Sequence, residues 1–176
     1  MRLLKNARQS GFSLIEVLVT IAILMIGLLG LAALQTNATV AEMEAYQRSQ
    51  ALVLAQDLAD RITANKGEAA NYVKDDVGLT AVDCSAKTAR WDIDLCEWGN
   101  LVNGAAETSG AGTKVGAMIG ARGCVTSPSA NVYMITIAWQ GMSAAGSSPG
   151  TCGASKYGTG QRRTVSQIVR VPLLGA

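Results

Sequence analysis

The acidic side chain in the most unusual surroundings is Glu16, which precedes an apolar run over residues 17–34 that only Thr20 interrupts. A carboxylate inside hydrocarbon costs about 2.5–3.5 kcal/mol on insertion scales, so such residues usually have an ionic partner and a function. We therefore take Glu16 as the first candidate for functional chemistry.

Catalytic chemistry is hard to build from the remaining residues, because the chain has no histidine. A Ser-His or Cys-His nucleophile is thereby excluded, as is any histidine-ligated metal. The motifs Asp75-Asp76 and Asp92-x-Asp94 could act as paired acids or bind calcium. However, the closing glutamate of a calcium loop is missing, and aspartate-rich turns are more typical of solvated surfaces. We therefore predict that the chain is not an enzyme and that it has no catalytic residue, metal site or cofactor.

The four cysteines are candidates for disulfides: Cys84, Cys96, Cys124 and Cys152. A zinc site is less favoured, because their spacing offers no short pair of ligands. An even number of cysteines in an extracytoplasmic region favours disulfides, with three connectivities possible. We prefer Cys84 with Cys96 and Cys124 with Cys152, because neighbours in sequence close small loops. The second loop is expected to contribute roughly 3–4 kcal/mol in the loop-entropy description.

The apolar run is long enough to cross a membrane when residues 12–15 are counted with it. A helix rises about 1.5 Å per residue, so about 20 residues span the hydrocarbon core of about 30 Å. A secretory signal peptide has a shorter apolar region of roughly 7–15 residues. The basic residues Arg2, Lys5 and Arg8 precede the run and predict a cytoplasmic N-terminus, with the bulk of the chain outside.

Composition agrees with one membrane segment followed by one domain. The chain has 176 residues, of which 49% are hydrophobic and 16% charged, and its apolar residues are concentrated at the front. Three of the 15 basic residues lie in residues 1–11, which leaves 12 basic against 13 acidic residues in the rest. Nucleic-acid binding needs a clustered basic face, and none is present beyond Arg162-Arg163, which we interpret as solvated.

A helix is predicted to continue past the membrane, because residues 35–65 contain no glycine or proline. Apolar residues recur there with several steps of three or four, which is typical of one helix face: Val40, Met43, Ala51, Leu54, Leu58 and Ile62. Gly67 is expected to end the helix.

The rest of the chain predicts a short helix over 91–102 and strands over 117–125, 131–139 and 164–172. The two tryptophans of that helix, Trp91 and Trp98, are interpreted as core residues. Three or four antiparallel strands against a long helix give an α+β fold. The expected divisions are a leader over 1–11, a transmembrane helix over 12–34, its amphipathic continuation over 35–66 and a globular domain over 67–176.

The octapeptide from Gly11 to Leu18, GFSLIEVL, resembles the prepilin motif of type IV pilins and type II secretion pseudopilins. The resemblance implies that a membrane-embedded aspartyl peptidase cuts between Gly11 and Phe12 and methylates the new amine of Phe12. A glycine before the cut fits this chemistry, because it lets the backbone extend into a protease without a side-chain clash. Glu16 would then face the amine of a neighbouring subunit and set its axial register, since opposite charges attract strongly at low dielectric.

Motifs further along the chain resemble the PilV group of minor pilins: Asp57-Leu58-Ala59-Asp60-Arg61, Gly123-Cys124, Ala138-Trp139-Gln140-Gly141, Cys152-Gly153 and Arg162-Arg163. This resemblance implies a low-abundance pilus subunit that primes or caps assembly and so supports adhesion and twitching motility. The implied partners are the prepilin peptidase, other minor and major pilins, the inner-membrane assembly platform and membrane lipid.

The implied location is the inner membrane before assembly, with a cytoplasmic N-terminus, and afterwards the pilus at the cell surface. The globular domain would be periplasmic or extracellular. Two alternatives stay open, namely a type II secretion pseudopilin and, less favoured, an uncut signal-anchored periplasmic binding protein or enzyme.

Overall fold

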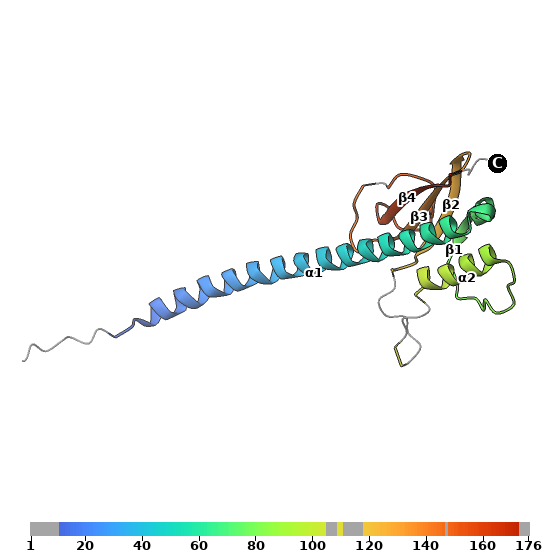
Figure 1. Ribbon diagram of the computed structural model, residues 1–176. Coiled ribbons are helices and arrows are strands. Elements are labelled where there is room, and N and C mark those ends of the chain that lie inside the picture. Colours follow the sequence, from blue (N-terminus) through green and yellow to red (C-terminus); the bar gives the residue numbers. More distant parts are fainter. Residues whose placement is uncertain (1–10, 105–108, 111–117, 147, 173–176) are drawn as a thin grey trace, which may run out of the picture. The chain divides into compact units, whose positions relative to one another are not determined.

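The structure is a computed structural model that describes residues 11–104, 109–110, 118–146 and 148–172. Its elements follow the order α1, η1, β1, α2, β2, β3 and β4 (Figure 1). The chain divides into two compact units, Met1–Ala41 and Glu42–Ala176, and the long helix α1 (Leu14–Ala64) contributes to both. Each unit is described separately below. The basic leader residues Arg2, Lys5 and Arg8 lie outside the described residues.

The first unit consists of the N-terminal part of α1, and its described side chains are exposed from residue 11 to residue 39. The threonine hydroxyls in this part donate back to helix carbonyls, as in Thr20 Oγ1 to Val17 O at 2.8 Å and Thr36 Oγ1 to Ala32 O at 3.1 Å. Such bonds satisfy the polar atoms of the helix within the helix itself. This part of α1 is therefore compatible with an apolar environment.

In the second unit, α1 packs one face into a core. Its buried residues are Gln47, Ala51, Ala55, Leu58, Ala59 and Ile62. The predicted apolar face is right in its main features, but Met43 lies outside it and is 45% exposed. The helix ends at Ala64, slightly before the expected Gly67, which lies in the 3₁₀ helix η1 (Lys66–Tyr72).

The sheet has four antiparallel strands in the order β1 (Lys74–Val77), β2 (Arg122–Ser129), β3 (Val132–Gln140) and β4 (Arg162–Arg170). The predicted α+β fold, a long N-terminal helix packed on a small antiparallel sheet, is confirmed. The last two strands lie within two residues of their predicted bounds.

Two details of the sheet differ from the sequence prediction. The strand expected over 117–125 begins at Arg122, because residues 118–120 form a turn; Ala117 lies outside the described residues. Strand β1 has no counterpart in the sequence prediction, because its motif Asp75-Asp76 favours a solvated turn. Aspartate has low strand propensity, and pairing with β2 forms this strand nevertheless.

The core is centred on Trp98 of α2 (Arg90–Val102), which is fully buried. Its indole Nε1 donates to Leu54 O of α1 at 2.8 Å, and the six-membered part of its ring lies against β2 at Gly123. A Cβ at Gly123 would come within 2.1 Å of the Trp98 ring, so glycine is required there for steric reasons. The core interpretation of Trp98 is confirmed, and Trp91 is partly buried against the same core.

Two disulfides stabilise the second unit, Cys84–Cys96 and Cys124–Cys152. The pairing is the one preferred from the sequence. The first closes the segment between β1 and α2. The second joins β2 to the long connection between β3 and β4, where both cysteines are buried with Ala138 and partly covered by Tyr157.

Candidate functional site

The residues singled out from the sequence, Gly11, Phe12 and Glu16, lie at the start of α1. Gly11, Phe12 and Ser13 precede the helix. The Ser13 carbonyl accepts hydrogen bonds from the amides of Glu16 at 3.0 Å and Val17 at 3.3 Å, so Ser13 occupies the N-cap position and Glu16 is the third helical residue. The spacing Ser-x-x-Glu is that of a capping box, but the described residues form neither of the two side-chain hydrogen bonds that define one. A carboxylate in the first turn is also favoured by the helix dipole.

The Glu16 side chain has no hydrogen-bonding or ionic partner among the described residues. Phe12 is 86% exposed, and a Cβ at Gly11 would meet nothing within 4 Å. Gly11, Phe12 and Glu16 lie close together along the chain, but no hydrogen bond or ion pair joins their side chains in the described structure. The Glu16 carboxylate is therefore free to meet a positive charge outside the described chain.

The apolar side chains that follow Glu16 are also without cover. Among the described residues, α1 is the one helix long and apolar enough to cross a membrane, with a mean hydropathy of 2.8 in its most apolar window and none of that window buried. Apolar surface on this scale marks a contact with lipid or with other proteins. The beginning of α1 thus combines an unpaired carboxylate with a surface that requires an external partner.

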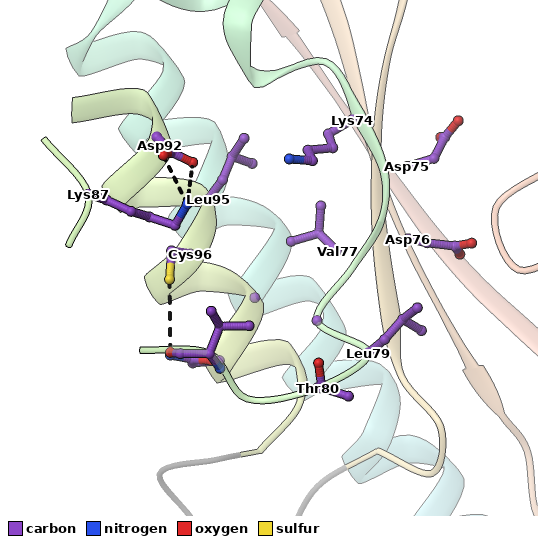
Figure 2. Close-up of a pocket in the computed structure, with 14 residues that line it drawn as sticks. Lys74, Asp75, Asp76, Val77, Leu79, Thr80, Lys87, Asp92, Leu95 and Cys96 are labelled. Carbon is purple, nitrogen blue, oxygen red and sulfur yellow. Dashed lines mark hydrogen bonds and ion pairs between the residues drawn. The ribbon is translucent and has the colours of Figure 1, made fainter. Parts of the chain in front are cut away.

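A second candidate site is a cavity of about 290 Å³ between β1 and α2 (Figure 2). Lys87 Nζ donates to both carboxylate oxygens of Asp92, at 2.8 and 2.9 Å. Lys74 extends from β1 toward α2, whereas the side chains of Asp75 and Asp76 point away from α2 (Figure 2). The four aspartates of the two motifs therefore do not form one cluster. The described residues contain no group of three or more histidine, cysteine or acidic side chains placed to hold a metal.

The interpretation of the second aspartate motif, Asp92-x-Asp94, as a solvated surface is wrong for Asp94, which is buried. Its side chain is 2% exposed and accepts hydrogen bonds from Tyr72 Oη at 2.5 Å, Arg90 Nη2 at 2.6 Å and Arg61 Nη1 at 3.2 Å. Burial, together with the hydrogen bond to Asp94, raises the pKa of Tyr72 to about 12. The cluster joins α1, η1 and α2, so its role is to hold the domain together.

The prediction that Arg162 and Arg163 are solvated is also wrong, because both side chains make contacts within the domain. Arg163 Nη2 lies 3.1 Å from Glu44 Oε1 on α1 and donates to Ser143 O at 2.8 Å. Arg162 donates to the carbonyls of Cys152 and Ser148. Both arginines therefore order the connection between β3 and β4.

The carboxylate of Glu44 is stabilised in its charged form by these neighbours. Ser143 donates its amide at 3.1 Å and its hydroxyl at 2.9 Å to Glu44 Oε1. Partial burial opposes ionisation, but the hydrogen bonds from Ser143 and Arg163 outweigh it and lower the pKa of Glu44. The sequence carries no signal for this contact, because Glu44 and Arg163 are 119 residues apart.

Comparison with protein families gives two adjacent matches. Residues 6–32 match the prokaryotic N-terminal methylation motif, and residues 33–101 match the Tt1218-like family, described as type IV pilin Tt1218. The region that is similar to a type IV pilin therefore lies directly behind the region that matches the N-terminal methylation motif. Searches of curated proteins and of solved structures returned no significant match.

The first match covers Gly11, Phe12, Glu16 and most of the apolar run over residues 17–34. The second begins at the end of that run and reaches the last turn of α2. Together they support a pilin-like prepilin subunit, and the type IV pilin family is a family of structural proteins. Strands β2, β3 and β4 lie beyond both matches, and neither family description names the PilV group.

Proposed function

We propose that the chain is a minor pilin of a type IV pilus, made as a prepilin and cut between Gly11 and Phe12 by the prepilin peptidase, which then methylates the amine of Phe12. The observation that carries the proposal is the unpaired Glu16 carboxylate at the head of an uncovered apolar helix. The methylation-motif match over residues 6–32 supports it. The family description of the adjacent region names a type IV pilin, which favours a pilus over a secretion pseudopilus.

Cleavage creates the positive charge that the carboxylate lacks. The new ammonium of Phe12 lies only four residues before Glu16, at the start of the same helix. When two such helices lie side by side in a low dielectric, the ammonium of one and the Glu16 carboxylate of the other attract each other. An unpaired charge is costly in that environment, so the pair selects one axial register between neighbouring subunits.

The remaining parts of the proposal follow from the same helix. Residues 1–11 are a leader that is removed, 12–34 anchor the subunit in the inner membrane and later in the filament, and 35–66 continue the helix into the domain formed by 67–176. The N-terminus is cytoplasmic and the domain is periplasmic, then exposed on the pilus. The partners are the prepilin peptidase, other minor and major pilins, the inner-membrane assembly platform and membrane lipid. As a minor subunit it would prime or cap the filament and support adhesion and twitching motility.

The test is the N-terminus of the mature protein. Mass spectrometry is expected to find N-methylated Phe12 as the first residue in the wild type. Gly11→Leu is expected to leave the intact precursor in the inner membrane, because a bulky side chain obstructs the protease. Gly27→Leu is a matched control, since a Cβ at Gly27 also meets nothing within 4 Å, and it should be processed normally.

A mature protein that retains Met1, or that begins at another residue, would contradict the proposal. Normal processing of the Gly11→Leu variant would contradict it equally.

A further inference from the structure

The two outer strands of the sheet, β1 and β4, present very different edges. Strand β1 has four residues, a shift in its register with β2, and a positive φ of 53° at Asp76. Short length, irregular pairing and charged side chains are the features that protect a sheet edge from further pairing. Strand β4 has nine residues paired with β3 without any shift, from Gln140↔Arg162 to Val132↔Arg170.

The hydrogen bonds at the two ends of β4 show which of its backbone groups face away from β3. The amide of Gly141 donates to Gln161 O, and the amide of Val171 donates to Asn131 O. Antiparallel pairs alternate between bonded and non-bonded, so the odd-numbered residues of β4 exchange hydrogen bonds with β3. The even-numbered residues therefore direct their N–H and C=O groups outward: Arg162, Thr164, Ser166, Ile168 and Arg170.

Most of these outward groups are free. Arg162 O accepts a hydrogen bond from Ser148 Oγ. From Thr164 to Arg170, the outward backbone groups have no partner among the described residues. Three of these residues, Ser166, Ile168 and Arg170, are also exposed at their side chains. This stretch has the regular geometry that an added strand requires.

The side chains along the open stretch indicate what kind of strand would fit. Ile168 is 61% exposed and lies opposite the partly exposed Met134, so an apolar pair borders the edge. Arg170 is exposed and has no ion pair within the described part of the chain. Near the start of β4, the connection between β3 and β4 covers the face of the sheet that carries Ile168. The Cys124–Cys152 disulfide holds this connection over Ala138. The uncovered surface therefore carries an exposed apolar side chain, Ile168, and an exposed cationic side chain, Arg170.

Charge argues against a second copy of β4 as the partner. The strand contains three arginines and no acidic residue, and among the described residues only Arg163 has an acidic partner, Glu44. Pairing β4 with itself would bring like charges together, which is unfavourable across strands. An acidic segment has the opposite effect.

We propose that the free edge of β4 is a docking site for an extended acidic segment of another polypeptide, which adds a fifth strand to the sheet. Backbone hydrogen bonds to residues 164–170 supply the affinity, and a carboxylate at Arg170 beside an apolar residue at Ile168 supplies the specificity. The proposal does not depend on the proposed pilus function.

Residue-resolved hydrogen exchange of the full chain in detergent micelles tests it. In the free protein, the amides of Thr164, Ser166 and Ile168 should exchange faster than those of Val165 and Val169, which bond to β3. The probe is a short synthetic peptide with glutamate at its N-terminus, valine two positions later and threonine elsewhere. In an antiparallel arrangement it places the glutamate opposite Arg170 and the valine opposite Ile168. Added at millimolar concentration, it should slow the outward amides selectively.

Two variants separate docking from folding. Arg170→Glu is expected to weaken binding of the glutamate peptide about fivefold and to strengthen binding of the same peptide with lysine in place of glutamate. Ile168→Pro removes an outward N–H without breaking a bond to β3, so it should abolish the protection, whereas Ile168→Val should retain it. Unchanged protection of Val165 and Val169 shows that each variant is folded.

Three results would overturn the proposal. The first is slow exchange of the outward amides in the free monomer. The second is self-association through β4 in the absence of peptide. The third is a failure to prefer the glutamate peptide over the lysine peptide.

Discussion

The helix α1 behaves in opposite ways in the two units that share it. Up to residue 39 it exposes every described side chain, including one unpaired carboxylate. From Glu42 onward it buries a full face and pairs charges such as Glu44 and Arg61. The first part of α1 thus exposes apolar side chains that contacts with lipid or another protein would have to cover. The second part is stabilised by contacts within its own unit.

The largest expected difference concerns Glu16. Glu16→Ala should leave cleavage and the melting temperature of the domain unchanged, yet abolish incorporation, because the ammonium of the neighbouring Phe12 loses its counter-charge. Immunoblots of sheared pili measure incorporation, and thermal circular dichroism measures the domain. Glu42→Ala is the control, since Glu42 is also exposed on α1. Equal incorporation of both variants would remove Glu16 from the proposed register, except for a subunit at the filament tip, where one side of the contact is absent.

Gly123 should show the largest effect on the stability of the second unit. Gly123→Ala forces a Cβ against the buried Trp98 ring, and overpacking of this kind costs about 3 kcal/mol. Chemical denaturation of the purified protein measures the loss. Gly146→Ala, at a site with open space around the Cβ position, should be close to neutral. A stable Gly123→Ala variant would mean that the contact between α2 and β2 is looser than the structure shows.

Asp94 should have a smaller effect. Asp94→Asn removes the negative charge shared by Arg61 and Arg90 and weakens the acceptor of Tyr72, so we expect a loss of about 2 kcal/mol. Asp92→Asn, two residues away, breaks only the partly exposed pair with Lys87 and should cost about 0.5 kcal/mol. Denaturation curves of the two variants should therefore separate clearly, and identical curves would show that burial of Asp94 contributes nothing.

The smallest expected effect is the pH dependence that arises from Glu44. Its folded-state pKa lies below the ordinary value of 4.5, so its contribution to stability is complete above that value and is lost as the pH falls through the folded pKa. Glu44→Gln should be less stable than the wild type by about 0.5–1 kcal/mol near neutral pH, and the difference should shrink in acid. A constant difference at all pH values would show that Glu44 is not stabilised as a carboxylate.

Sequence patterns predicted the regular elements well where the signal was local. The helix α2 and strands β3 and β4 were found within two residues, because apolar periodicity and β-branched runs marked them. Strand β1 was missed, because Lys74, Asp75 and Asp76 carry no strand signal and form a strand only by pairing with β2.

The candidate site at the head of α1 could be read from the sequence because all of its chemistry is contiguous. Gly11, Phe12, Glu16 and the apolar run lie within a short stretch, and neither folding nor packing changes their relation to one another. The interpretation of Asp94 and Arg163 as solvated was wrong for the opposite reason. Their partners Arg61 and Glu44 lie 33 and 119 residues away, and no local pattern announces them.

By itself, the amino-acid sequence determined the membrane-sized apolar helix, the carboxylate at its head and the α+β order of elements, because these depend on neighbouring residues. Only the tertiary structure decided that Trp98 rests on Gly123, that Asp94 is buried between two arginines, and that β4 ends the sheet with a free edge. Those features depend on backbone and side-chain groups that approach one another only when distant segments fold together.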